Sequence, residues 1–104
     1  MGKYTYLFYL KWSREEIHKS ARALTCARHE YYDKEWKPKL LDLCIEHGVE
    51  LLKDTNPFGT VEESLYIFDT DIPLDEFTKF SNAIFAIVEE DVIEYSKTTI
   101  CLNN

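Results

Sequence analysis

Glycine, proline and cysteine are all scarce in this 104-residue sequence, which contains three of each. Three scattered glycines cannot form the glycine-rich loop that holds a phosphate at the start of a helix. Three cysteines are too few, and odd in number, for a disulfide framework, which favours a reducing compartment and predicts a cytoplasmic location. The apolar run AIFAIV at 83–88 is far shorter than the roughly 20 residues that a membrane-spanning helix needs. The length and the 45% hydrophobic content predict a single folded domain over 1–104.

Positive charge is scarce in the second half of the chain. Residues 54–104 contain two lysines and eleven acidic residues, whereas residues 1–53 contain ten Lys and Arg against eight acidic residues. An acidic surface repels the phosphates of nucleic acid, so direct nucleic-acid binding by the second half is disfavoured. The charge instead predicts either high solubility or a protein partner with a basic surface.

The hydrophobic pattern predicts an α+β fold with the order β-α-α-β-α-β. Apolar residues alternate over 3–12, as in a strand with one buried face. Two helices are expected next, from Ser13 to about Trp36 and from about Pro38 to Lys53, because Ser13 begins a capping box and Pro38 suits a helix start. They form a hairpin on one face of a three- or four-stranded sheet.

The second half of the pattern predicts a central strand, a third helix and a final strand. The central strand is SLYIFD at 64–69, which is apolar on both faces. The helix follows Pro73, and its apolar stripe of Phe77, Phe80, Ile84, Ile87 and Val88 predicts an end near Glu90. The last strand then runs from about 92 to 102. The alternative is a hairpin of 83–89 and 92–102 that turns at 90–91.

Two C-x-x-H segments raise the question of a zinc site. Cys26 and His29 form the first, and Cys44 and His47 form the second; Cys and His are the ligands that zinc prefers, and residues three apart on a helix share a face. In an antiparallel hairpin the two pairs would lie level with each other. However, Cys26 and His29 fall on the polar side of their helix, whereas Cys44 and His47 fall on the apolar side of theirs. The pattern therefore favours Cys44 as a small core residue, His47 at the edge of the core and no bound metal, with a zinc-binding domain as the alternative.

The segment YIFDTD at 66–71 resembles the first motif of haloacid-dehalogenase-type phosphotransferases. That resemblance implies Asp69 as a nucleophile and Asp71 as an acid/base group. Such enzymes also need a further magnesium ligand, a phosphate-binding lysine and a larger parallel sheet, for which the 35 residues after Asp69 leave little room. A small enzyme that binds a divalent cation at Asp69 and Asp71 is a second alternative, while a turn role for Asp71 before Pro73 is simpler.

The sequence therefore predicts a non-catalytic protein-interaction domain without a cofactor, in which the acidic half binds a basic surface on a partner. One version of this hypothesis is a viral inhibitor that covers the nucleic-acid-binding face of another protein. Aromatic residues among charges at the hairpin tip are typical of interfaces, although they also suit packing of the turn onto the sheet. The candidate partner-binding residues are Asp69, Asp71, Asp75, Glu76, Glu89, Glu90, Asp91, Glu94, Tyr32 and Trp36.

Overall fold

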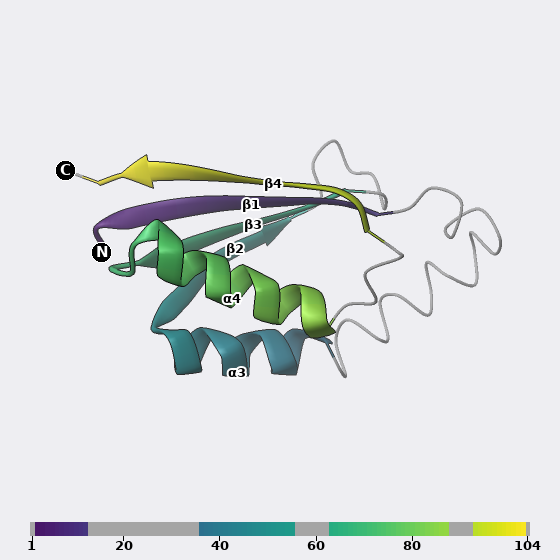
Figure 1. The fold of residues 1–104 in the computed structure, drawn as a ribbon, viewed down its shortest axis with the longest axis horizontal. Coiled ribbons are helices and arrows are strands. Elements are labelled where there is room, and N and C mark those ends of the chain that lie inside the picture. The colour runs from purple at the N-terminus through teal and green to yellow at the C-terminus, as the bar shows by residue number, and fades with distance from the viewer. Residues whose placement is uncertain (1, 13–35, 56–62, 88–92, 104) are drawn as a thin grey trace, which may run out of the picture.

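Four antiparallel strands form one sheet in the order β2-β3-β1-β4, with two helices on the same side of it (Figure 1). The computed structural model describes residues 2–12, 36–55, 63–87 and 93–103. No helix in these ranges is long and apolar enough to cross a membrane. The elements along the chain are β1 (Tyr4–Trp12), α3 (Lys37–His47), β2 (Val49–Thr55), β3 (Glu63–Thr70), α4 (Leu74–Ile87) and β4 (Ile93–Leu102).

The alternating apolar residues of β1 form a buried face, as the sequence predicts. Tyr6, Phe8 and Leu10 are buried against the helices, while the residues between them are only partly covered. β1 lies in the middle of the sheet and pairs with β3 on one side and with β4 on the other. A strand with two neighbours and one helix-covered face buries every second side chain, which is the period-2 pattern in the sequence.

An aromatic core fills the space between the sheet and the helices. Phe77 of α4 stacks on Tyr6 of β1, with ring centroids 3.8 Å apart and planes inclined by 4°. Phe68 of β3 meets Phe80 of α4 edge to face at 5.1 Å. These rings bury large apolar areas in stacked and edge-on arrangements, which hold α4 against the centre of the sheet.

The predicted second helix is too long, because residues 49–55 form a strand instead. α3 begins near Pro38 as expected, but it ends at His47, and Gly48 follows with φ = 70° in the left-handed region. Glycine adopts this conformation without a Cβ penalty and so commonly terminates helices. The chain then turns into β2, which pairs with β3 and has a register shift between Leu51 and Lys53. The predicted element order therefore lacks one strand.

The third predicted helix and the last predicted strand are present as α4 and β4, so the alternative hairpin over 83–102 is wrong. Phe77, Phe80 and Ile84 are buried on the inner face of α4. The first helix of the predicted hairpin, over 13–36, lies almost wholly outside the described residues. What the structure shows is a small α+β fold with a four-stranded antiparallel sheet and two helices, which confirms the predicted class.

Candidate functional site

The two carboxylates of the D-x-D segment hold the start of β1. Asp69 is the more buried, with 6% of its surface exposed, and its Oδ2 accepts a hydrogen bond of 2.6 Å from the backbone N–H of Gly2. Asp71 is exposed, and its Oδ1 accepts a bond of 2.9 Å from the backbone N–H of Lys3. Asp69 lies in β3, the neighbour of β1, and Asp71 directly follows the end of that strand, so the position of both acids at this end of the sheet is set by the strand pairing.

Asn103 connects the end of β4 to the same cluster. Its Nδ2 donates to the backbone oxygen of Gly2 and to Oγ1 of Thr5, each at 2.9 Å, and makes a longer contact of 3.4 Å with Oδ1 of Asp69. Its backbone N–H donates to the oxygen of Lys3 at 2.9 Å. We call Gly2, Thr5, Asp69 and Asn103 the terminal clamp, because they join the ends of β1, β3 and β4. The clamp gives Asp69 a structural role that needs no substrate or metal.

Gly2 is in close contact with the backbone of β3. A Cβ at this position would lie 2.5 Å from both the carbonyl carbon and the oxygen of Thr70, closer than real Cβ atoms approach a backbone. The close contact is what allows the N–H of Gly2 to reach the carboxylate of Asp69. The absence of a side chain at Gly2 is therefore part of the clamp geometry.

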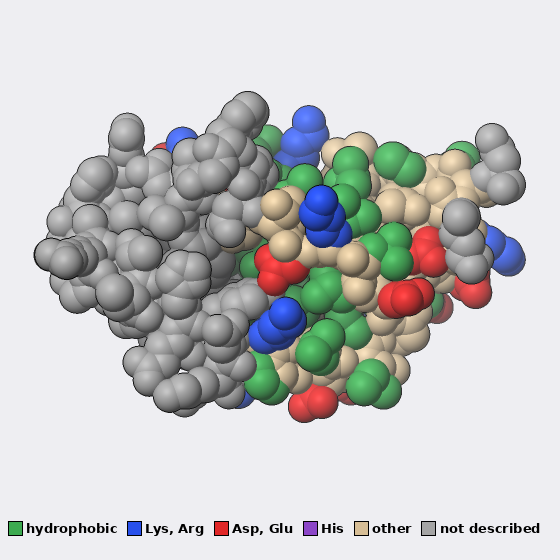
Figure 2. Space-filling model, turned by 180° about the vertical axis from the view of Figure 1, so that it is seen from behind, with side chains coloured by type: hydrophobic (Ala, Val, Ile, Leu, Met, Phe, Trp, Pro, Cys, Tyr) green, Lys and Arg blue, Asp and Glu red, His purple; other side chains and the backbone are tan. Residues whose placement is uncertain are grey.

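An open pocket of about 410 Å³ lies beside the clamp. Its acidic side is formed by Asp69 and Asp71 together with Glu50 from the edge strand β2, and no Lys or Arg is among the described residues that line it. Its apolar side includes Ile45 of α3, which is 82% exposed. Figure 2 shows acidic side chains gathered with apolar ones at the right-hand end of the molecule. The described residues that line this acidic pocket are Gly2, Cys44, Ile45, Gly48, Val49, Glu50, Asp69, Thr70 and Asp71.

Among the described residues, the pocket contains one thiol, that of Cys44, and this thiol is not activated. Cys44 is 4% exposed, and burial raises the pKa of its thiol from 9.0 to about 11. The thiolate is the nucleophilic form, so at neutral pH this cysteine remains a protonated, inert core residue. This confirms the predicted core position of Cys44 and gives no support to a cysteine nucleophile in the pocket.

We expect Cys44 to resist alkylation at pH 8 while the exposed Cys101 reacts, in protein that carries Cys26→Ser. The pKa of Cys44 is higher in the folded protein than in the unfolded chain. The stabilising contribution of the buried, protonated thiol is therefore complete below about pH 9 and is lost as the pH rises toward 11. The measurement is iodoacetamide labelling followed by mass spectrometry, together with urea denaturation across this pH range. Cys44→Ala is the control and should show a smaller loss of stability between pH 9 and 11. Rapid labelling of Cys44 in the folded protein would contradict the prediction.

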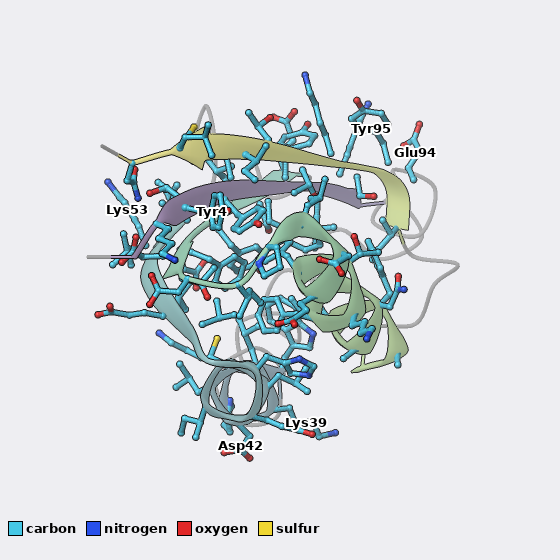
Figure 3. All side chains as sticks on the ribbon, turned by 60° about the vertical axis from the view of Figure 1, so that its left-hand side comes forward. Tyr4, Lys39, Asp42, Lys53, Glu94 and Tyr95 are labelled. Atoms are coloured by element: carbon cyan, nitrogen blue, oxygen red, sulfur yellow. The ribbon has the colours of Figure 1, made fainter. Side chains whose placement is uncertain are left out.

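The structure brings together only some of the acids predicted to bind a partner. Asp69 and Asp71 line the pocket, and Asp75 and Glu76 are exposed in the first turn of α4, which follows β3 directly. Glu94 is exposed near the start of β4, at the opposite end of the sheet (Figure 3). Glu89, Glu90 and Asp91 lie outside the described residues.

Of the two aromatic residues predicted to bind a partner, Tyr32 and Trp36, the structure describes only Trp36. Tyr32 lies outside the described residues. Trp36 is only 2% exposed, and its ring lies 5.3 Å from that of Tyr66 in the core. Trp36 therefore does not lie at an accessible surface, and its position agrees with the alternative interpretation, in which it packs the turn onto the sheet.

The two C-x-x-H segments can be compared only in part, since Cys26 and His29 lie outside the described residues. His47 is half-buried and makes an edge contact of 5.5 Å with Phe80, as expected for a residue at the edge of the core. Within the described ranges, no group of three or more His, Cys, Asp or Glu side chains is placed to hold a metal ion. The expected absence of stoichiometric zinc remains a prediction, which elemental analysis would test.

Sequence reasoning missed Glu50 and Ile45 as pocket residues, because it placed residues 38–53 in one helix. One signal could have found them. Gly48 directly follows His47, and a glycine after a basic residue is a typical helix end. A helix that ended at His47 would have placed Ile45 in its last turn and Glu50 in the strand that follows. The two residues would then lie on either side of Gly48.

The comparisons with known proteins bear on the fold alone. No family model matches the chain, and no curated protein sequence is similar to it. An uncharacterized NIPSNAP domain protein from Burkholderia xenovorans has a similar structure, with a TM-score of 0.55 and 8% identity over 97% of this chain and 94% of that one. A nipsnap family protein with unknown function from Agrobacterium tumefaciens aligns with a TM-score of 0.55 and 12% identity, over 98% of this chain and 88% of that one. A second NIPSNAP family protein from that organism aligns with a TM-score of 0.56 and 11% identity, over 97% and 85%.

These neighbours correct one part of the sequence-based interpretation. They are bacterial proteins with a NIPSNAP-like fold, so the predicted viral inhibitor has no support. Identity of 8–12% shows a shared fold and does not transfer a function. The chain is a small α+β protein whose function must be argued from its own surface.

Proposed function

We propose that this chain is a non-catalytic protein-interaction domain whose acidic pocket binds a basic segment of a partner protein. The observation that carries the proposal is the lining of the pocket: three carboxylates, from Glu50, Asp69 and Asp71, lie beside the exposed side chain of Ile45. A lysine or arginine side chain combines an aliphatic stem with a charged head, so it suits a pocket that is apolar on one side and acidic on the other.

The contacts of the two aspartates support a binding role over a catalytic one. Asp69 and Asp71 each accept a backbone N–H bond, which fixes them in place as acceptors. The only described thiol in the pocket has a raised pKa, and no histidine is among the lining residues that the structure describes. A cytoplasmic location fits the free thiols of Cys44 and Cys101.

The test uses a fluorescent peptide with alternating leucine and arginine residues, and a matched peptide in which glutamate replaces arginine. We expect the arginine peptide alone to bind, and to associate faster at low salt than at physiological salt, where the Debye length is about 8 Å. The double variant Glu50→Gln with Asp71→Asn removes two charges from the pocket and keeps hydrogen-bond acceptors at both positions. It should weaken binding by about tenfold, as the loss of two favourable charge contacts of roughly 0.7 kcal/mol each predicts.

The matched control is Asp42→Asn with Glu46→Gln, which removes the same charge from exposed positions on α3 outside the pocket lining (Asp42 is labelled in Figure 3). This variant should bind within about twofold of the original protein. Equal weakening by the two variants, or salt-independent association, would show that the acidic residues only solubilise the protein.

A further inference from the structure

A second apolar stripe runs along α3, separate from the side chains that pack on the sheet. Leu40 and Cys44 are buried on the inner side of this helix. Pro38, Leu41 and Ile45 have the i, i+3, i+7 spacing of one helix face, roughly 140° round the helix from the buried side. All three are exposed, and Leu41 and Ile45 are 42% and 82% exposed. We call these three residues the outer stripe of α3.

The outer stripe leads into the acidic pocket. Ile45 belongs to both, since it lines the pocket together with Gly48, which follows the last residue of α3. In Figure 2 apolar side chains are exposed along the lower edge of the molecule, where α3 lies in Figure 1, up to the acidic side chains at the right-hand end. The C-terminal end of a helix carries a partial negative charge, and here it lies beside Glu50 and Asp71. The surface therefore changes from apolar to negative along the length of α3.

The edge of the sheet next to this surface is unsuited to pairing with a further strand. β2, the edge strand that packs beside α3, has a register shift between Leu51 and Lys53. The side chains of Glu50, Lys53 and Asp54 are exposed along it. Bulges and charges of this kind prevent edge-to-edge pairing. Binding of a partner segment as an added strand is therefore disfavoured here, and the packing of an amphipathic helix on an apolar stripe is the other common mode of recognition.

We propose that the basic segment bound by the acidic pocket is an amphipathic helix that lies along α3. This inference rests on the proposed function and specifies the conformation of the partner segment. Apolar side chains of the partner helix, spaced i, i+3 and i+7, contact Pro38, Leu41 and Ile45, and an arginine in its last turn enters the pocket. An arginine at that position also stabilises its own helix, because a cation is favoured at a helix C-terminus.

Charge favours a protein helix over a membrane as the occupant of the outer stripe. Helices that lie on a lipid surface have basic residues beside their apolar face, which attract anionic headgroups. The exposed charged residues nearest in sequence to Ile45 are Asp42, Glu46 and Glu50, all of them acidic. An anionic membrane would be repelled by this surface, whereas a basic helix is attracted to it.

Two peptides of identical leucine, arginine and alanine content distinguish the helical mode from the proposed function itself. In the helical peptide the leucines are spaced i, i+3 and i+7 and the arginines occupy the last turn; in the alternating peptide leucine and arginine alternate, which suits an extended chain. We expect the helical peptide to bind about tenfold more tightly, because its leucines reach the outer stripe as well as the pocket. Its circular dichroism should show a gain of helix on binding.

The two possible failures have different meanings. Equal or tighter binding of the alternating peptide, or binding of the helical peptide without a gain of helix, would disprove the helical mode and leave the proposed function intact. Failure of both peptides to bind would disprove the proposed function and the helical mode with it.

Leu41→Gln tests the part of the outer stripe that lies outside the pocket lining. It should weaken binding of the helical peptide about fivefold or more and change binding of the alternating peptide by less than about twofold. The matched control is Leu102→Gln, at a side chain that is 74% exposed in β4, on the opposite edge of the sheet from β2. It should leave binding of both peptides unchanged. Equal effects of the two glutamine variants on the helical peptide would show that the partner does not lie along α3.

Vesicles that contain phosphatidylserine test the alternative occupant. We expect the unmodified protein not to sediment with them, because acidic side chains flank the outer stripe. Sedimentation with these vesicles that Leu41→Gln abolishes would assign the outer stripe to a lipid surface and overturn the proposal.

Discussion

Phe68→Ala should reduce the free energy of unfolding by about 3–5 kcal/mol, the usual range for truncating a buried phenylalanine. Phe68 is fully buried in β3, and its ring lies 5.1 Å from that of Phe80 and 6.0 Å from that of Phe77. It also lies 6.4 Å from the ring of Phe8 in β1. The side chain therefore contacts the sheet and α4 together, so its loss leaves a cavity that no single neighbour can fill.

Because small proteins are stabilised by only about 5–15 kcal/mol, this variant should be close to unfolding at 37 °C. Urea denaturation followed by circular dichroism measures the difference. Ile45→Ala, at a side chain that is 82% exposed, should change the stability by less than about 0.5 kcal/mol. A loss below about 1 kcal/mol for Phe68→Ala would mean that β3 and α4 are not packed as described.

The elements that could be predicted from the sequence are those whose periodicity decides between helix and strand. β1 alternates over its whole length because one of its faces is covered by helices, and Tyr6, Phe8 and Leu10 are buried as a result. α4 has a stripe of period 3.6 because one side of it lies on the sheet, with Phe77 and Phe80 buried. In both cases the burial that creates the pattern is local to one element, so the sequence contains the information.

β2 could not be predicted in the same way because it is an edge strand with little burial. Of its seven residues only Val49 is buried, and Leu52 is 54% exposed. Two adjacent leucines after an amphipathic helix resemble one more helical turn, and the register shift after Leu51 breaks the alternation that would indicate a strand. Gly48, with its positive φ, was the only residue that marked the change.

The acidic pocket depends on contacts between residues that are far apart in the chain. The acids Asp69 and Asp71 were identified as a pair from the D-x-D spacing, but their hydrogen bonds go to Gly2 and Lys3, 67 and 68 residues away. The spacing of two carboxylates does not distinguish a metal site from a pair of backbone acceptors. That choice is made by the pairing of β1 with β3, which no local pattern specifies.

Asp69→Ala should cost about 1–3 kcal/mol of unfolding free energy, because it removes the carboxylate that joins the strand ends. The N–H of Gly2 would lose its 2.6 Å acceptor in a partly buried position, and Asn103 would lose one of its contacts. A polar group that remains buried without a partner costs more than the hydrogen bond itself contributes. We also expect faster amide exchange at Gly2 and Lys3 than in the original protein, since the start of β1 would no longer be held to β3.

Asp69→Asn separates this structural role from a catalytic one. Its side-chain oxygen can still accept from Gly2, while the contact with the amide of Asn103 is lost, so the stability loss should be about half that of Asp69→Ala or less. Asp71→Ala removes one exposed bond to Lys3 and should cost below about 1 kcal/mol. If Asp69 were instead a catalytic nucleophile, Asp69→Asn would leave the free energy of unfolding unchanged and would abolish a magnesium-dependent phosphatase activity. The terminal clamp predicts instead that Asp69→Asn still binds the arginine peptide, about threefold more weakly because one of the three pocket charges is lost, and that the free energy of unfolding falls with the number of hydrogen bonds lost.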